Sequence, residues 1–143
     1  MNNATVIKAS AATLLAIIGA SAAVAAPASI TGNWVTPERD AVIRIAPCGT
    51  SMCGTIAKYL KTPPDGVNQR DRYNPNKKLR SRKVLGIRVL LNFKPDGKKW
   101  RGKIYDARNG RSYRSVVYRG KSGRLIVKGC VGPICRTQKW SAR

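Results

Sequence analysis

The sequence predicts an all-β protein, an eight-stranded antiparallel up-and-down barrel with one long loop that carries a short helix. Short apolar–polar alternations recur from Ile30 onward, turn residues separate them, and helical periodicity is nearly absent. Consecutive hairpins build a meander, and closing a long meander removes both exposed edge strands. A sandwich of two sheets is the alternative, because similar strand spacing serves both architectures.

The N-terminal segment comes first, and residues 1–25 have the features of a secretory signal peptide. Lys8 supplies positive charge, residues 9–20 are mostly apolar, and Ala23-Val24-Ala25 offers small residues for cleavage. The apolar stretch is shorter than the ~20 residues of a membrane-spanning helix, so we expect cleavage and not anchoring. We therefore predict an exported protein with one domain over residues 26–143 and no transmembrane segment. The periplasm is the expected location, with extracellular release as the alternative.

Eight extended segments follow, joined mostly by short turns. In chain order they are residues 30–36, 41–46, 54–60, 84–93, 100–105, 112–118, 125–128 and 136–140. Asp96-Gly97, Asn109-Gly110 and Ser122-Gly123 are hairpin signals between the later segments. In the fourth segment an apolar residue occurs at every second position, which predicts one buried face: Leu85, Ile87, Val89, Leu91 and Phe93.

The long loop lies between the third and fourth segments, from Lys61 to Lys83. Asn74-Pro75 is typical of a helix N-cap followed by proline in the first turn, so Asn76 to Arg82 is expected to form a short helix.

Four cysteines form two pairs with the same spacing, Cys48 with Cys53 and Cys130 with Cys135. Each pair encloses four turn-like residues between strand-like segments, and export would place the thiols in an oxidising compartment. We predict two disulfides that each close a hairpin. A zinc site is the alternative use, but histidine is absent and metal sites more often space their cysteines by two residues. Pairing between the two ends of the chain also stays open, because four cysteines allow three connectivities.

Charge is the strongest compositional feature. Loss of Lys8 with the signal peptide leaves 27 basic against 6 acidic residues, and such a bias favours contact with polyanions. Eleven basic residues gather in two clusters that we predict as polyanion-binding: Arg70, Arg72, Lys77, Lys78, Arg80, Arg82, Lys83, Lys98, Lys99, Arg101 and Lys103. The partner would be an anionic envelope component such as lipopolysaccharide, because an exported protein meets little nucleic acid.

Catalysis is not predicted, because the residues for it are missing. There is no histidine, Glu38 is the only glutamate, and the aspartates are scattered. Asp71 with Asp106 is the only pair of carboxylates worth considering. Asp71 is better explained as a residue that holds the loop by bonding backbone amides. We expect a non-enzymatic protein that needs no metal and no cofactor.

Several short motifs together resemble the DUF2147 family, small exported bacterial proteins of uncharacterised function. The resemblance covers about Ile30 to Trp140 and implies a barrel like those of lipocalins and fatty-acid-binding proteins. Ala107 departs from the proline usual in the family, and the charge is more extreme. The motifs are Gly32-Asn33-Trp34, Cys53-Gly54-Thr55-Ile56, Asp71-Arg72-Tyr73-Asn74-Pro75, Leu79-Arg80-Ser81-Arg82, Trp100-Arg101-Gly102-Lys103-Ile104-Tyr105-Asp106, Gly110-Arg111-Ser112-Tyr113, Gly129-Cys130-Val131-Gly132 and Arg136-Thr137-Gln138-Lys139-Trp140.

The opening Gly32-Asn33-Trp34 is also similar to lipocalins, in which the tryptophan plugs one barrel end beneath a late arginine. By this resemblance Trp34 would plug the barrel with Arg136 or Arg143 on its face.

The last segment suggests a ligand site, because alternation puts Arg136, Gln138 and Trp140 on one face. Fatty-acid-binding proteins, which this barrel is predicted to resemble, hold a carboxylate with an arginine on the final strand. Our hypothesis is that Arg136 and Gln138 anchor a small acidic amphiphile, such as a fatty acid or lipid. Its tail would lie against four apolar residues: Trp34, Leu85, Ile87 and Val89.

Two alternatives stay open. Arg136 and Asp106 form an ion pair inside a filled barrel without a ligand, or the chain is a basic structural or stress protein of the cell envelope that binds anionic polymers.

Overall fold

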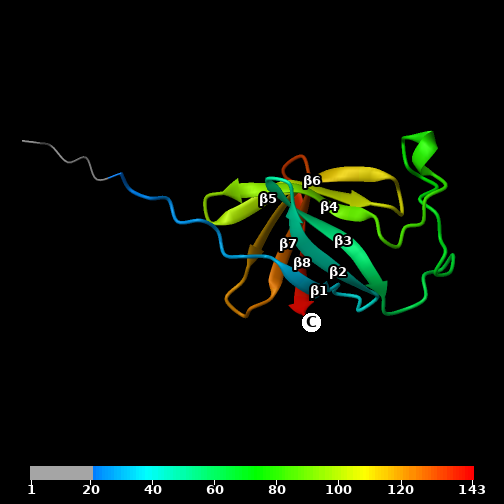
Figure 1. The fold of residues 1–143 in the computed structure, drawn as a ribbon, viewed down its shortest axis with the longest axis horizontal. Coiled ribbons are helices and arrows are strands. Elements are labelled where there is room, and N and C mark those ends of the chain that lie inside the picture. Colours follow the sequence, from blue (N-terminus) through cyan, green and yellow to red (C-terminus); the bar gives the residue numbers. More distant parts are fainter. Residues whose placement is uncertain (1–20) are drawn as a thin grey trace, which may run out of the picture.

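Eight antiparallel strands form a closed barrel in the computed structural model, which describes residues 21–143 (Figure 1). Each strand pairs with its chain neighbours, and the barrel closes where the first strand pairs with the last. The predicted up-and-down barrel is confirmed, and the sandwich alternative is wrong. The strands are β1 (Gly32–Val35), β2 (Ala41–Cys48), β3 (Ser51–Tyr59), β4 (Arg88–Asp96), β5 (Lys99–Asp106), β6 (Arg111–Arg119), β7 (Leu125–Val131) and β8 (Ile134–Ala142).

Most of the predicted signal peptide lies outside the residues that the structure describes. Residues 1–20 of the predicted signal peptide are not among the described residues, so its cleavage stays a prediction. Within residues 21–143 no helix is long or apolar enough to cross a bilayer.

Strand direction alternates around the barrel, so successive connections lie at opposite ends. One end, which we call the closed end, carries the entry into β1, the β2–β3 hairpin and the β4–β5 and β6–β7 turns. The other, the open end, carries the β1–β2 turn, the long loop from residue 60 to 87, the β5–β6 turn and the β7–β8 hairpin. Figure 1 shows the long loop projecting from one side of the barrel and the N-terminal segment leaving from the opposite side.

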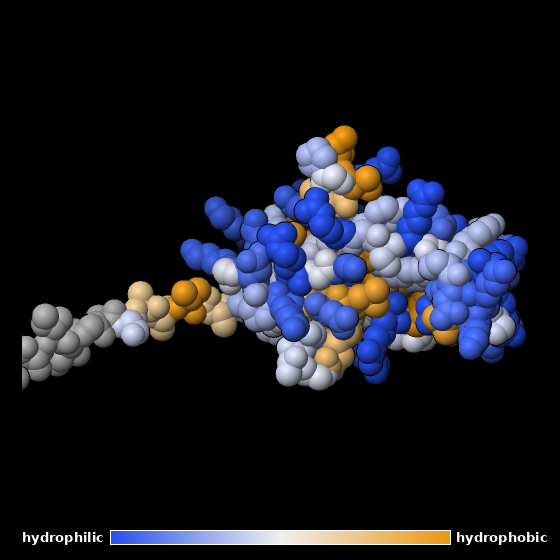
Figure 2. All heavy atoms as spheres, turned by 90° about the horizontal axis from the view of Figure 1, so that it is seen from above, coloured by the Kyte–Doolittle hydropathy of each residue, from blue (hydrophilic) through white to orange (hydrophobic). Residues whose placement is uncertain are grey.

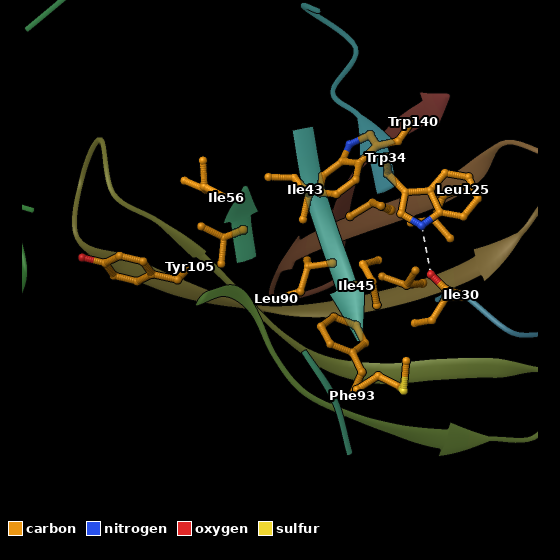
Figure 3. Packing of buried hydrophobic residues seen from close by; sticks show 14 of the residues in the cluster. Ile30, Trp34, Ile43, Ile45, Ile56, Leu90, Phe93, Tyr105, Leu125 and Trp140 are labelled. Atoms are coloured by element: carbon orange, nitrogen blue, oxygen red, sulfur yellow. Dashed lines mark hydrogen bonds between the residues drawn. The ribbon is translucent and has the colours of Figure 1, made fainter. Parts of the chain in front are cut away.

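Large apolar side chains fill the closed end, with Trp34 among them (Figure 3). The Trp34 Nε1 donates to the carbonyl of Ile30 at 2.9 Å, and the Arg119 guanidinium lies 4.8 Å from the centre of its ring. The arginine over Trp34 is therefore Arg119, and the prediction of Arg136 or Arg143 is wrong. Arg136 lies near the open end of the barrel. Ala142 pairs with Trp34 and lies on the same, inward face of the sheet, so the next residue, Arg143, does not share that face.

β4 does not present the single alternating face that its sequence predicts. Leu90 pairs with Gly54 and faces the interior, whereas Leu91 pairs with Lys103 and faces outward. The register shifts between β3 and β4 at Gly54, and again between Leu91 and Lys94. Each bulge adds a residue and so reverses which alternate positions face inward.

The long loop is tied to the outer face of β5 through Asp71, which is 0% exposed. Tyr105 donates its hydroxyl to Asp71 Oδ1 at 2.5 Å, and Asn74 Nδ2 donates to Oδ2 at 2.8 Å. Arg82 completes the cluster with an ion pair of 2.8 Å. Asp71 thus holds the loop, as expected, but through side chains and not through backbone amides.

The predicted loop helix is shorter than expected. It is a single turn of 3-10 helix, η1 (Lys77–Leu79). Asn76 is its N-cap, since its side chain accepts from the Lys78 amide. Asn74, the predicted cap, accepts from the Asn76 amide through its side-chain oxygen at 2.9 Å, and its side-chain nitrogen donates to Asp71 and Tyr105.

Both hairpin disulfides are present, Cys48–Cys53 in the β2–β3 hairpin and Cys130–Cys135 in the β7–β8 hairpin. No cysteine of the described chain is free. Pairing is therefore local, and the zinc alternative does not hold. One disulfide lies at each end of the barrel.

Candidate functional site

A cavity of about 1040 Å³ opens at the open end of the barrel. The four connections of that end surround its mouth, and strands from both halves of the barrel form its walls. The closed end is filled by the cluster around Trp34, so the barrel is a cup and not a channel. This shape agrees with the rule that an eight-stranded barrel has room for packed side chains or for one small ligand.

The deeper walls of the cup are apolar, because the inward positions of the strands carry aliphatic and aromatic residues. Ile43 and Ile56 face inward from β2 and β3, Val89 from the bulge in β4, and Val127 and Trp140 from β7 and β8. All five side chains are buried. Ile56 and Tyr105 lie toward the opposite side from Trp34 and Ile30 in Figure 3.

Three small residues form a row on the inner face of the sheet, and one of them, Gly129, borders the cavity. Gly102, Ser115 and Gly129 lie side by side on the inner face of β5, β6 and β7. The Phe93 ring fills the space at Gly102, where an added Cβ would lie 2.7 Å from it. At Gly129 an added Cβ would meet only a methyl group of Ile104, at 3.4 Å. Gly129 therefore borders the cavity without occupying it.

Polar groups lie on β8, next to this row. Gln138 accepts a hydrogen bond of 2.7 Å from the Trp140 indole, which leaves the Gln138 amide nitrogen available to the cavity. Arg136 pairs with Gly129 across the β7–β8 ladder and lines the cavity while staying exposed. It belongs to none of the ion pairs in residues 21–143.

Asp106 does not form the predicted ion pair with Arg136. Its carboxylate bonds to Arg108 through Nε at 3.0 Å and Nη2 at 3.1 Å, within the β5–β6 turn. The hydrogen bond and the charge of Asp106 raise the pKa of Arg108 above its ordinary value. Glu38 and Asp40 add smaller contributions in the same direction. The ion pair between Arg136 and Asp106, which was the alternative to a bound ligand, is therefore absent.

The mouth of the cup differs in charge from the rest of the molecule. Four of the six acidic residues of the chain line it: Glu38, Asp40, Asp65 and Asp106. Asp65 pairs with Arg72, and Asp106 with Arg108. Opposite charges therefore offset one another around the opening, whereas the remaining surface is overwhelmingly basic.

The other predicted ligand residues do not all gather at the cup. Arg136, Gln138, Val89 and Asp106 line it, but Trp34 lies in the closed end. Ile87 lies in a second hollow beneath the long loop, together with Leu91 and Tyr105. Leu85 is 38% exposed and precedes β4. The tail contacts predicted for Leu85 and Ile87 assumed a strand that begins at residue 84, but β4 begins at Arg88, so both residues belong to the end of the long loop.

Two tyrosines of the cup were not found from the sequence. Tyr59 lines it and accepts from the Gln69 side chain at 2.9 Å, and Tyr113 lines it and accepts from Asn109 at 3.0 Å. Strand alternation was the signal that could have found Tyr113, since it lies two positions before Ser115 on the inner face of β6.

The two predicted basic clusters are apart. Arg70 to Lys83 belong to the long loop at the open end, whereas Lys98 and Lys99 lie at the β4–β5 turn of the closed end. Three of the clustered arginines are also engaged in ion pairs, Arg72 with Asp65, Arg82 with Asp71 and Arg101 with Asp96. Hydrophilic residues cover most of the face in Figure 2, and apolar residues emerge between them in small groups.

The geometry offers no site for acid–base catalysis by Asp71 and Asp106. Asp71 is enclosed by its own three donors beneath the long loop, and Asp106 is bound to Arg108. Within residues 21–143 no three histidine, cysteine, aspartate or glutamate residues are grouped to hold a metal ion.

Comparisons with known proteins agree with this fold. The structure resembles protein HP1028 from Helicobacter pylori, which is described as belonging to the lipocalin family. The TM-score is 0.69 at 22% identity, over 80% of this chain and 83% of that one. No curated protein sequence matches the chain. The model of a family described as uncharacterized protein conserved in bacteria, DUF2147, matches residues 32–142. The chain therefore belongs to the DUF2147 family, in a barrel of the lipocalin type.

Proposed function

We propose that this protein is an exported, non-enzymatic binding protein whose cup holds one small acidic amphiphile. The observation that carries the proposal is the cup itself, a cavity of about 1040 Å³ that ends against the Trp34 cluster. Small-molecule pockets typically enclose roughly 300–1,000 Å³ and are mostly apolar with a few placed polar groups. The cup has this size and composition.

The position of the polar groups supports an acidic head group. Arg136 and the free amide hydrogens of Gln138 are donors on one strand, above the apolar walls of Ile43, Val89 and Val127. A guanidinium at the edge of an apolar cavity is stabilised by a carboxylate or phosphate. Since Asp106 is engaged by Arg108, the ligand is the partner that Arg136 lacks.

Displacement of a fluorescent fatty acid tests the proposal, with two substitutions that act on different parts of the cup. Gly129→Ile places an aliphatic side chain in the space that the cavity occupies, and Thr137→Ile adds the same group on the outer face as its control. We expect Gly129→Ile to weaken binding by about a hundredfold and Thr137→Ile to leave it unchanged.

The second substitution concerns the head group. Arg136→Gln should weaken binding of a fatty acid about tenfold or more and have little effect on the corresponding alcohol, because only the acid uses the charge. Lys139→Gln, which faces outward on the same strand, is the control. Native mass spectrometry of gently purified protein checks for a natural ligand. If no lipid copurifies and no fatty acid binds below millimolar, the proposal is wrong.

A basic protein of the envelope without a small ligand is the second candidate. The observation in its favour is the chain from Arg111 to Arg143, which contains no acidic residue and forms three neighbouring strands. This role predicts binding to lipopolysaccharide that disappears at high salt and is unaffected by Gly129→Ile.

A further inference from the structure

The tip of the β7–β8 hairpin exposes two aliphatic side chains at the mouth of the cup. Val131 is 66% and Ile134 is 73% exposed, more than any other large hydrophobic residue of the barrel or its loops. The two pair across the hairpin, so they form one apolar point with Gly132-Pro133 between them. Exposed apolar groups of this kind mark sites that contact a partner or a membrane.

The tip is held rigidly at the rim. The Cys130–Cys135 disulfide closes the hairpin directly behind the tip, and Arg114 of β6 donates to the Gly132 carbonyl. Val131 and Ile134 also line the cavity mouth. A fixed apolar tip loses little conformational entropy when it becomes buried, which favours insertion.

Basic side chains surround the tip on the barrel wall. Arg114 and Arg136 lie on the strand positions that pair with Cys130 and Gly129, and Lys128 lies one position further along β7. No acidic residue occurs in β6, β7 or β8, and the four acidic residues of the mouth come from other connections. An apolar tip with a cationic collar complements a surface that is apolar beneath an anionic layer.

We propose that the β7–β8 hairpin docks the open end of the barrel on an anionic phospholipid bilayer. Val131 and Ile134 enter the boundary between head groups and acyl chains, while Arg114 and Lys128 face the lipid phosphates. The mouth of the cup then opens toward the membrane, so an acidic amphiphile passes between bilayer and cup without crossing water. This last step rests on the proposed function, but docking itself does not.

Vesicle flotation with the oxidised, exported protein tests docking. Vesicles of phosphatidylglycerol and phosphatidylcholine should bind the protein, and vesicles of phosphatidylcholine alone should bind it much more weakly. The double substitution Val131→Ser with Ile134→Ser should reduce binding to the anionic vesicles about tenfold or more, because the tip no longer gains from burial. The matched control is Val67→Ser with Leu79→Ser, two exposed aliphatic residues of the long loop. It should change binding less than twofold.

Three results would overturn docking through the tip: no binding of the unsubstituted protein, equal binding of the tip variant, or equal weakening by the control. Equal binding of the tip variant would mean that charge alone attracts the protein, as for a soluble polyanion.

A soluble fatty-acid probe, measured without vesicles, separates the two proposals. Gly129→Ile should lose the probe while keeping vesicle binding, because Gly129 faces the interior of the barrel and the substitution leaves the exposed tip unchanged. Probe binding without vesicle binding overturns docking alone. Vesicle binding without probe binding supports docking and overturns the cavity proposal.

Discussion

At Gly110 the backbone of the β5–β6 turn passes so close to the long loop that no side chain fits. Its φ is +69°, and an added Cβ would lie 1.8 Å from the carbonyl oxygen of Tyr73. Glycine is thus required twice, for the left-handed backbone and for the contact. Because Tyr73 adjoins Asn74 of the Asp71 cluster, this contact helps position the loop at the mouth of the cup.

We therefore expect Gly110→Ala to destabilise the protein by more than the usual cost of a left-handed alanine. Gly123→Ala is the matched control, because Gly123 has a φ of +75° but nothing within 4 Å of an added Cβ. The control should lower the free energy of unfolding by about 1 kcal/mol, and Gly110→Ala by about 3 kcal/mol or more. Urea unfolding measures both, and equal losses would contradict the contact.

Tyr105 links the loop to the barrel in a way that depends on pH. Burial, then the hydrogen bond to Asp71 and the charge of Asp71, raise the pKa of Tyr105 from 10.0 to about 12. The folded state therefore holds the phenolic proton more tightly than the unfolded state does. By linkage, this stabilisation is complete below about pH 10 and is lost as the pH rises from 10 through 12.

Tyr105→Phe should accordingly cost most below pH 10. Removing one donor from the buried carboxylate of Asp71 should lower the free energy of unfolding by about 1–3 kcal/mol at pH 8. The difference from the unsubstituted protein should narrow between pH 10 and 12, as measured by urea unfolding at several pH values. Tyr73→Phe, at a tyrosine that is 57% exposed, serves as the control. A constant difference across this range would show that Tyr105 does not titrate in this way.

At the scale of single elements, the two hairpins that carry a disulfide have the same cysteine spacing but different surroundings. Each disulfide joins cysteines five positions apart, so each closes a very short loop. The β2–β3 hairpin lies at the closed end, where Met52 and Cys53 are buried. The β7–β8 hairpin has only exposed residues at its tip. Packing therefore supports the first hairpin more than the second.

Replacing Cys130 and Cys135 by serine should leave the barrel folded and loosen the tip. The chain-entropy argument gives about 2 kcal/mol for so short a loop, and the same loss is expected for Cys48→Ser with Cys53→Ser. Hydrogen exchange should show faster exchange at residues 130–135 in the first variant and a smaller change at residues 48–53 in the second. If either variant lost the circular dichroism spectrum of a β-sheet protein, the disulfide would be needed for folding itself.

For the whole molecule, charge is the dominant property. The chain carries 28 basic and 6 acidic residues, and four of the acids gather at the mouth of the cup. Apart from Asp96, which pairs with Arg101, the exposed charges of the rest of the barrel wall are all positive. Their mutual repulsion opposes the compact state, and salt screens it.

Stability should therefore rise with ionic strength. Between about 10 mM and about 500 mM sodium chloride the Debye length falls from roughly 30 Å to roughly 4 Å, so the urea midpoint should increase. Sucrose at equal osmolality separates screening from general preferential exclusion. A midpoint that falls with salt would show that attractive pairs such as Asp71–Arg82 outweigh the repulsion.

The extent to which the sequence predicted the structure varies between these features. All eight strands, the hairpin turns and the local disulfides were predicted, because alternation and turn chemistry act between near neighbours. The arginine over Trp34 was not, because Arg119 and Trp34 come together only when β6 and β1 meet the same barrel end. The Asp71 cluster was missed for the same reason, since Tyr105 is 34 positions away.

The candidate site was predicted in part. Arg136 and Gln138 were placed on one face because a regular strand alternates without interruption, and β8 is regular. The contacts of Leu85 and Ile87 were misplaced because both residues lie in the end of the long loop, before β4 begins at Arg88, and where a strand begins depends on its neighbour in the sheet. The hollow itself had no signal in any one segment, because its lining comes from β2 to β8 and from the loops between them, which meet only in the assembled barrel.

The sequence by itself thus determined the strand meander, the two staples and the excess of positive charge, since each depends on local spacing or on composition. Only the tertiary structure decided that the barrel is hollow at one end, that the acids collect at that mouth, and that Val131 and Ile134 stand exposed beside it. These features arise from which residues face one another across strands, and that depends on register, bulges and closure of the sheet, which act over the whole chain.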